Sequence, residues 1–267
     1  LYKNAGIVVL DEPTAALDPI AENELYLKYN MLTKGTTSLY ISHRLASTRF
    51  CDRIFYIEDG KIAEIGKLDG DGLDCTGMRV LPGFIDIHIH GCNLADTTDG
   101  KKDSVLVMSR WLAGKGVTSF CPTTMTLPIP ELQKSFRYAA DAMGHEPGAY
   151  IHGINMEGPF ISPAKKGAQA EEYIIAPDYD TFARLNAVCP VKLVDVAPEM
   201  PGALEFAERA SKVCTVSAAH TTATYEHAKA GYEHGFSHVT HLFNAMVGLG
   251  SREAGTVGAV MDSSTVT

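Results

Sequence analysis

Side chains that commonly bind metal ions stand on one apolar run of this 267-residue sequence. His88 and His90 lie in Phe84-Ile-Asp-Ile-His-Ile-His90, which reads as a short strand. Side chains alternate between the two faces of a strand, so both imidazoles share one face, while Ile85 and Ile87 point into the covering layer. Two such imidazoles can hold one cation. The alternative is a pair of partly buried histidines bonded to the backbone or to Asp86.

Three further candidate ligands follow other apolar runs. Glu157 ends Ile151-His-Gly-Ile-Asn-Met-Glu157, His220 ends Val216-Ser-Ala-Ala-His220, and His241 ends Ser237-His-Val-Thr-His241. A single histidine at the end of a strand is more often an ordinary surface residue. Five candidates at the ends of four strands instead predict a metal site. We expect the other histidines after Phe84 to be structural, namely His145, His152, His227, His234 and His238.

The elements that must position these residues alternate between strand and helix from Phe84 onward, which is typical of parallel β/α folds. The pattern predicts strands near 84–90, 117–121, 150–156, 191–196, 214–219 and 237–242, and another near 257–261. Helices are expected at 104–115, 130–143 and 203–213. The favoured fold is a TIM-type (β/α)₈ barrel, which carries its sites at the C-terminal ends of the strands. A complete barrel needs about 250 residues, so we expect 84–267 to form an incomplete one.

Composition excludes several other classes of function. The net charge of −9 and the absence of a basic block argue against nucleic acid as the main partner. The six cysteines have no Cys-x-x-Cys spacing, which indicates reduced thiols in a cytoplasmic protein. No apolar run has membrane-spanning length, so we expect no membrane insertion. The first residue is Leu1 rather than Met, and we interpret the chain as a fragment.

Residues 1–58 carry a different pattern, two apolar strands that each end in polar residues. The strings are Gly6-Ile-Val-Val-Leu-Asp-Glu-Pro-Thr-Ala-Ala-Leu-Asp-Pro19 and Thr36-Thr-Ser-Leu-Tyr-Ile-Ser-His-Arg44. They resemble the second half of an ABC-transporter ATP-binding domain. The resemblance implies that Asp11 lies near Mg²⁺, Glu12 polarises the attacking water, Asp18 belongs to the D-loop and His43 faces the γ-phosphate.

The sequence lacks the phosphate loop that this chemistry needs, because no Gly-Lys pair is followed by Ser or Thr. We therefore interpret residues 1–58 as a partial P-loop-NTPase-like αβ fragment, truncated and without a nucleotide site. The alternative is the ATPase component of a transporter. Residues 59–83 follow as the remnant of a small β-sandwich, and 84–267 as the barrel. The boundary between the first two segments lies between Asp52 and Gly66. Here Arg53–Gly66 is predicted to form a hairpin with a two-residue Asp59-Gly60 turn.

From about residue 59 the chain resembles the N-acetylglucosamine-6-phosphate deacetylase family of the amidohydrolase superfamily. The matching strings are Leu-Pro-Gly-Phe-Ile-Asp-Ile-His-Ile-His-Gly, Met-Glu-Gly-Pro-Phe, Lys-Lys-Gly-Ala-Gln, Ala-Pro-Glu-Met, Ala-Ala-His-Thr-Thr-Ala-Thr and Thr-His-Leu-Phe-Asn-Ala-Met. The resemblance implies hydrolysis of the acetamide of an amino-sugar phosphate, with release of acetate. It implies that Glu157, His220 and His241 hold one divalent metal, Zn²⁺ or Fe²⁺. His88 and His90 would hold a second, with Glu157 as a bridge.

The same resemblance implies the residues that contact the substrate. Ala168 and Gln169 match the loop that contacts the sugar, Asn244 and Ala245 match a sugar-phosphate contact, and Arg252 matches the phosphate-binding arginine. The family's general acid/base aspartate would fall beyond Thr267, and we expect impaired activity in this chain for that reason. Intact members of the family are expected to be homodimers.

Overall fold

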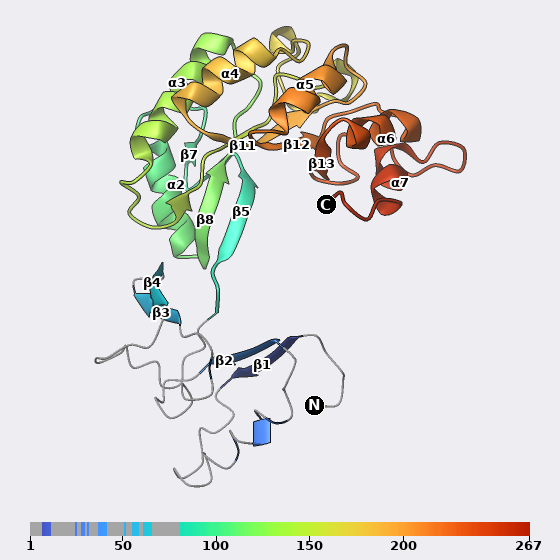
Figure 1. The fold of residues 1–267 in the computed structure, drawn as a ribbon. Coiled ribbons are helices and arrows are strands. Elements are labelled where there is room, and N and C mark those ends of the chain that lie inside the picture. Colours follow the sequence, from blue (N-terminus) through green and yellow to red (C-terminus); the bar gives the residue numbers. More distant parts are fainter. Residues whose placement is uncertain are drawn as a thin grey trace. The chain divides into compact units, whose positions relative to one another are not determined.

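The computed structural model describes residues 7–11, 25, 28–29, 31, 37–41, 51, 55–58, 61–65 and 81–267. Its internal contacts divide the chain into two units, Leu1–Gly83 and Phe84–Thr267 (Figure 1). The candidate metal ligands all belong to the second unit.

Two pairs of strands are described in the first unit. β1 (Ile7–Asp11) pairs in parallel with β2 (Thr37–Ile41), and β3 (Phe55–Glu58) pairs in antiparallel with β4 (Lys61–Ile65). The second pair confirms the predicted hairpin, because Glu58 lies opposite Lys61 and leaves two residues for the turn. Asp11 ends β1, as expected, but Glu12, Asp18 and His43 lie outside the described residues. Their role in ATP hydrolysis stays a prediction.

The second unit is built on parallel strands that pair in the order in which they occur along the chain. One sheet contains β5 (Phe84–Ile89), β8 (Val117–Pro122) and β9 (Tyr150–Ile151). The next contains β10 (Ile154–Met156), β11 (Val191–Val196), β12 (Thr215–Ala218) and β13 (Phe236–Val239). A bridge between Thr123 and Asn155 joins the two sheets. This order is consistent with part of a (β/α) barrel.

Helices follow the strands along the chain (Figure 1). They are α2 (Ser104–Ala113), α3 (Ile129–Ala142), α4 (Tyr179–Val188), α5 (Ala203–Ala210), α6 (Tyr225–Glu233) and α7 (Gly255–Met261). Short connections are the β6–β7 hairpin (Gly91–Cys92 and Ala95–Asp96) and the 3₁₀ turns η2 (Pro163–Lys165) and η3 (Glu171–Tyr173). None of the helices in the described ranges combines the length and hydropathy needed to cross a bilayer.

The prediction of a strand near 257–261 is wrong, because these residues belong to α7. A short apolar run of this kind satisfies either pattern, and its period alone does not separate them. The backbone that pairs with β13 on its other side is instead Thr267, at the end of the described chain. The N–H of Val239 donates to Thr267 O (2.8 Å) and the N–H of Thr267 donates to Ser237 O (3.2 Å).

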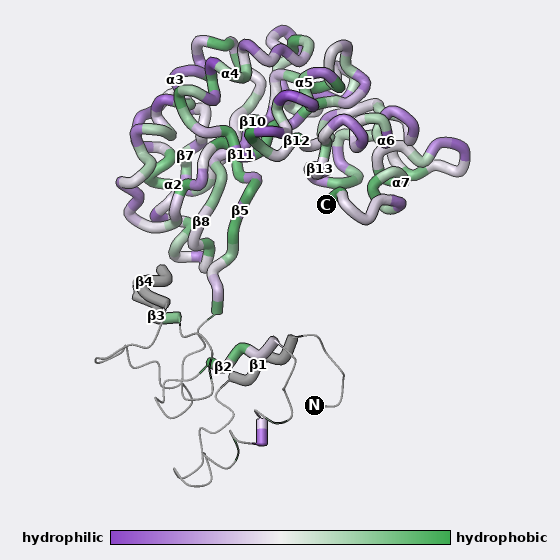
Figure 2. The backbone as a smooth tube through the Cα atoms, viewed as in Figure 1, coloured by the Kyte–Doolittle hydropathy of each residue, from purple (hydrophilic) through white to green (hydrophobic). Residues whose placement is uncertain are grey.

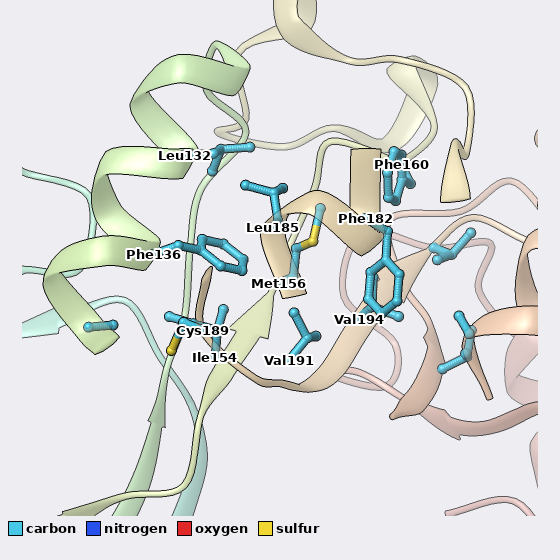
Figure 3. Close-up of a cluster of buried hydrophobic side chains, with 14 of the residues drawn as sticks. Leu132, Phe136, Ile154, Met156, Phe160, Phe182, Leu185, Cys189, Val191 and Val194 are labelled. Carbon is cyan, nitrogen blue, oxygen red and sulfur yellow. The ribbon is translucent and has the colours of Figure 1, made fainter. Parts of the chain in front are cut away.

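The core lies between the strands and the helices that cover them. Figure 3 shows Leu132 and Phe136 of α3 and Phe182 and Leu185 of α4 directed toward side chains of β10 and β11. In α3, the buried residues recur at helical spacing, which places one apolar face on the sheet. Figure 2 shows the result along the tube, where the helices alternate between hydrophobic and hydrophilic residues. This packing fixes the strands whose ends carry the candidate ligands.

β5 is covered only in part, as expected for a strand of an incomplete barrel. Phe84, Ile85 and Ile87 are 73%, 62% and 42% exposed, and only Ile89 packs against the core. Within the described residues, β5 pairs with β8 and with no strand on its other edge.

Four cysteines of the second unit are free thiols, namely Cys92, Cys121, Cys189 and Cys214. Burial raises the pKa of the Cys121 and Cys189 thiols to about 11 and that of Cys214 to about 12. These three thiols are therefore poor nucleophiles and act as small apolar side chains.

Candidate metal centre

Glu157 stands at the centre of the site. It directly follows β10, is 2% exposed, and precedes the cis Gly158–Pro159 peptide bond. Its Oε1 atom lies 3.1 Å from His220 Nε2 and 3.2 Å from His241 Nε2. On the other side, His90 Nε2 lies 3.0 Å from Oε2 and His88 Nε2 lies 3.5 Å from Oε1. The five predicted ligands thus come together from strands far apart in the sequence.

The cluster divides into two groups that share Glu157. One contains His88, His90 and Glu157, and the other contains Glu157, His220 and His241. In each group the possible ligand atoms lie within 4.8 Å of one another. These are the same two groups of residues to which the family resemblance assigns two metal positions, with Glu157 in both.

Backbone carbonyls orient two of the histidines. His220 Nδ1 lies 2.8 Å from Lys165 O, and His241 Nδ1 lies 3.1 Å from Asn244 O. A carbonyl can only accept, so each Nδ1 carries the proton and each Nε2 presents its lone pair to Glu157 when the ring is neutral. Carbonyl partners of this kind fix the tautomer of metal-binding histidines.

His88 is held by a residue that the sequence analysis missed. Asn155 is fully buried in β10, its Nδ2 donates to Ile87 O (2.9 Å), and the same atom lies 3.3 Å from His88 Nδ1. The sequence could have pointed to Asn155, since it is the one polar residue of the otherwise apolar Ile154-Asn-Met156 strand. A buried polar side chain needs hydrogen-bond partners.

The charges of the cluster stabilise one another. Burial opposes ionisation of Glu157, but hydrogen bonds with His220, His241 and His90 outweigh it and hold the pKa of this carboxyl well below its ordinary value. The hydrogen bond with Glu157 raises the pKa of His241, and it also raises that of His90 against the effect of burial. For His88, burial dominates and lowers the pKa.

These residues fit a divalent cation. His220 Nε2 and His241 Nε2 lie 3.2 Å apart and both face the Glu157 carboxylate. When both rings are neutral, this arrangement brings lone pairs together without a proton between them, and a cation relieves the repulsion. His90 Nδ1 is buried and has no hydrogen-bond partner among the described residues, so Nε2 is its engaged nitrogen. Imidazole nitrogens with a carboxylate oxygen are a typical zinc ligand set.

The expected substrate residues lie at different depths around the cluster. Ala168 is exposed on the loop whose Lys165 carbonyl holds His220, and Asn244 is exposed in the turn that follows His241. Ala245 is half-buried there and accepts a backbone hydrogen bond from Thr221 (3.0 Å). Gln169 is buried and donates to Glu157 Oε2 (2.6 Å). Arg252 is exposed and forms no ion pair with the residues that the structure describes.

Glu199 holds the residues next to His220, and the sequence analysis did not identify it as a site residue. Its carboxylate accepts from the N–H of Thr222 (2.6 Å), from the Thr222 hydroxyl (2.9 Å) and from the Thr221 hydroxyl. These residues directly follow His220 in the chain, so Glu199 holds the turn that carries this ligand. The signal was a carboxylate in Ala-Pro-Glu-Met, just past the end of β11.

The histidines that we expected to be structural lie outside the two ligand groups of the described chain. His234 Nδ1 bonds to Ala230 O (2.7 Å), and His238 Nδ1 lies 2.9 Å from the Ser217 hydroxyl. His152 stacks edge-on against Tyr150. Asp262, the last carboxylate of the sequence, accepts from the Tyr225 hydroxyl (2.6 Å) and contributes nothing to the cluster.

Comparison with known proteins agrees with this geometry. The amidohydrolase family profile matches residues 79–261, and the chain belongs to that family. It is 33% identical over 214 residues to N-acetylglucosamine-6-phosphate deacetylase from Lysinibacillus sphaericus (77% of this chain, 55% of the relative). It is 35% identical over 194 residues to the Bos taurus protein of that name (69% and 47%).

A solved deacetylase of the same name from Thermotoga maritima superposes with a TM-score of 0.67 at 32% identity, covering 80% of this chain and 56% of that one. The Pasteurella multocida structure gives 0.68 at 30% identity, covering 78% and 57%. The chain spans about half the length of the curated relatives it matches.

Proposed function

We propose that this chain carries the metal centre of an enzyme that hydrolyses the acetamide of N-acetylglucosamine 6-phosphate to glucosamine 6-phosphate and acetate. One observation carries the proposal. Two three-residue ligand groups share Glu157 at the ends of parallel strands, in a chain whose relatives are named for this reaction.

The amide bond dictates what the site must supply. An amide is a poor electrophile, so water must become more nucleophilic and the carbonyl must be polarised. A bound divalent cation does both, because it lowers the pKa of water and acts as a Lewis acid. Glu157, His220 and His241 would hold one cation, with His88 and His90 beside it. The nitrogen and oxygen ligands suit Zn²⁺ or Fe²⁺.

The rest of the substrate requires contacts that the metal does not provide. Ala168 and Asn244 are exposed next to the anchors of His220 and His241, and we assign them to the sugar together with Ala245. Arg252 has no carboxylate partner among the described residues, and we assign it to the phosphate, which the planar guanidinium binds with two parallel hydrogen bonds. A cytoplasmic location and a homodimeric assembly complete the proposal.

Titration calorimetry on the 267-residue chain tests this function. With Zn²⁺ present, we expect binding of N-acetylglucosamine 6-phosphate roughly tenfold or more tighter than binding of N-acetylglucosamine, from the charged phosphate contact. The zinc dependence should disappear in Glu157→Gln. Binding that is equal with zinc and with chelator, or equal for both sugars, would contradict the assignment.

A further inference from the structure

Gln169 occupies a position between Glu157 and the backbone that follows β8. It is 3% exposed, and each end of its amide has a partner. Its Nε2 donates to Glu157 Oε2 (2.6 Å), and its Oε1 accepts from the N–H of Thr126 (2.6 Å). A backbone N–H can only donate, so the Thr126 contact fixes the orientation of the amide. The NH₂ group must face Glu157.

This contact makes the two oxygens of Glu157 unequal. Oε1 faces His220 (3.1 Å), His241 (3.2 Å) and, at a longer distance, His88 (3.5 Å), while Oε2 faces His90 (3.0 Å) and also receives the Gln169 amide. The short hydrogen bond engages the electron density that Oε2 would otherwise offer to a cation bound beside His90. An NH₂ group cannot coordinate a cation in return.

Resting on the proposed function, we propose that Gln169 ranks the two halves of the metal centre. The half built from Glu157, His220 and His241 binds a divalent cation first and more tightly. The half built from His88, His90 and Glu157 binds a second cation weakly, because Gln169 donates to Oε2, the Glu157 oxygen that the first half leaves free and that His90 faces. Gln169 is thus a positioning residue that sets how many metal ions the protein holds at a given metal concentration.

The surroundings keep the amide in place. Met125 Sδ lies 3.7 Å from Gln169 Nε2, and a side chain at Gly158, whose φ is +72°, would collide with the Thr126 hydroxyl. Thr126 therefore packs directly against the turn that carries Glu157. If Gln169 swung away, the N–H of Thr126 and the carboxylate of Glu157 would both lose a buried hydrogen-bond partner.

Metal titration without substrate tests the inference. Zinc is added to the chelator-treated 267-residue chain, and the affinities are measured by calorimetry with a competing chelator. Gln169→Met keeps the length of the side chain and removes the donor. We expect its second affinity to rise about tenfold or more, the order of magnitude by which groups around metal ligands change metal affinity, while the first stays unchanged.

Gln133→Met is the matched control, since Gln133 is the other glutamine of the sequence and lies on α3. It should leave both affinities unchanged. Gln169→Glu is a second test if the methionine variant folds poorly. It replaces the donor with a carboxylate that can itself bind the second cation, so the second zinc affinity should rise. His90→Asn should remove the weaker affinity and spare the stronger one.

The outcomes separate the two proposals. A wild-type chain that binds two zinc ions with equal affinity, or a Gln169→Met variant that leaves the second affinity unchanged, would overturn the inference and leave the deacetylase proposal standing. A chain that binds no zinc would overturn the metal centre itself.

Discussion

Thr240, which precedes the candidate metal ligand His241 in the chain, donates its hydroxyl to Asp195 Oδ1 across 2.6 Å. The Thr240 oxygen also lies 2.7 Å from the Ser217 hydroxyl, which in turn lies 2.9 Å from His238 Nδ1. A hydroxyl has one proton, so Ser217 donates to Thr240 and His238 donates to Ser217. The buried chain of hydrogen bonds ties β11, β12 and the end of β13 together under the site.

Removing the hydroxyl of Thr240 should destabilise the protein. In Thr240→Val the shape is kept, but Asp195 and Ser217 lose a buried partner, which costs about 1–3 kcal/mol. Thr240→Ser keeps the hydroxyl and is the matched control. The free energy of unfolding from urea titrations compares the two, and a valine variant at least as stable as the serine variant would contradict the assigned hydrogen bonds.

Asp195 should make stability depend on pH. Burial raises the pKa of Asp195 from 3.8 to about 7, and the nearby Glu157 charge acts in the same direction. Below the ordinary pKa, folded and unfolded chains both carry the proton, and Asp195 costs nothing. As pH rises toward the folded pKa, the unfolded chain ionises first and the folded protein loses stability, by a total on the order of a few kcal/mol.

The difference between wild type and Asp195→Asn isolates this effect, because asparagine does not ionise. In chelator, wild type should lose stability relative to the variant between about pH 4 and pH 7. The lowered pKa of Glu157 works in the opposite direction and is common to both proteins. If the difference in the free energy of unfolding between wild type and Asp195→Asn stays constant across this pH range, the pKa of Asp195 is not raised.

Binding of zinc should stabilise the second unit. A ligand that binds only the folded state at 100 times its Kd adds about 2.7 kcal/mol to the free energy of unfolding. We expect this gain in wild type and less than half of it in Glu157→Gln, which loses the oxygen shared by both ligand groups. His227→Asn changes a histidine outside the cluster and should keep the full gain. Equal stabilisation of wild type and Glu157→Gln would place the bound zinc elsewhere.

Glu199 should affect the metal without touching it. Glu199→Gln brings an NH₂ group against donors from Thr221 and Thr222, so the turn that carries His220 can no longer be held by three hydrogen bonds. We expect the tighter zinc affinity to fall roughly 10- to 100-fold. Glu208→Gln changes an exposed glutamate and serves as the control. Identical affinities in the two variants would show that the turn holds its shape without Glu199.

The five candidate ligands could be found from the sequence because each stands on or just after a strand that the hydrophobic pattern identifies. Parallel strands bring their carboxyl ends to one edge, so His88 and His90 at one strand and Glu157 at another meet without any knowledge of the intervening helices. Helices α4 and α6 were not predicted as such, but the strand order that they connect was recovered.

The supporting residues could not be predicted in the same way. Asn155, Gln169 and Glu199 act through hydrogen bonds across long stretches of sequence, and their types alone specify no partner. Gln169 illustrates the difference. Its motif suggested a sugar contact, whereas in the structure both ends of its amide are engaged inside the protein. The strand expected at 257–261 failed for a related reason, since a short apolar run does not determine its own period.

His220 and His241 adopt left-handed backbone conformations, with φ of +45° and +35°. Such a conformation costs a residue other than glycine about 1–3 kcal/mol, and asparagine tolerates it better than most. Replacing either histidine with alanine therefore changes the backbone as well as the metal site, and a loss of binding would mix the two effects. Asparagine is therefore the better replacement for measuring how much each imidazole contributes to metal affinity. A cation that holds both rings would also repay part of the strain, so metal loading and the shape of these two turns are thermodynamically one equilibrium.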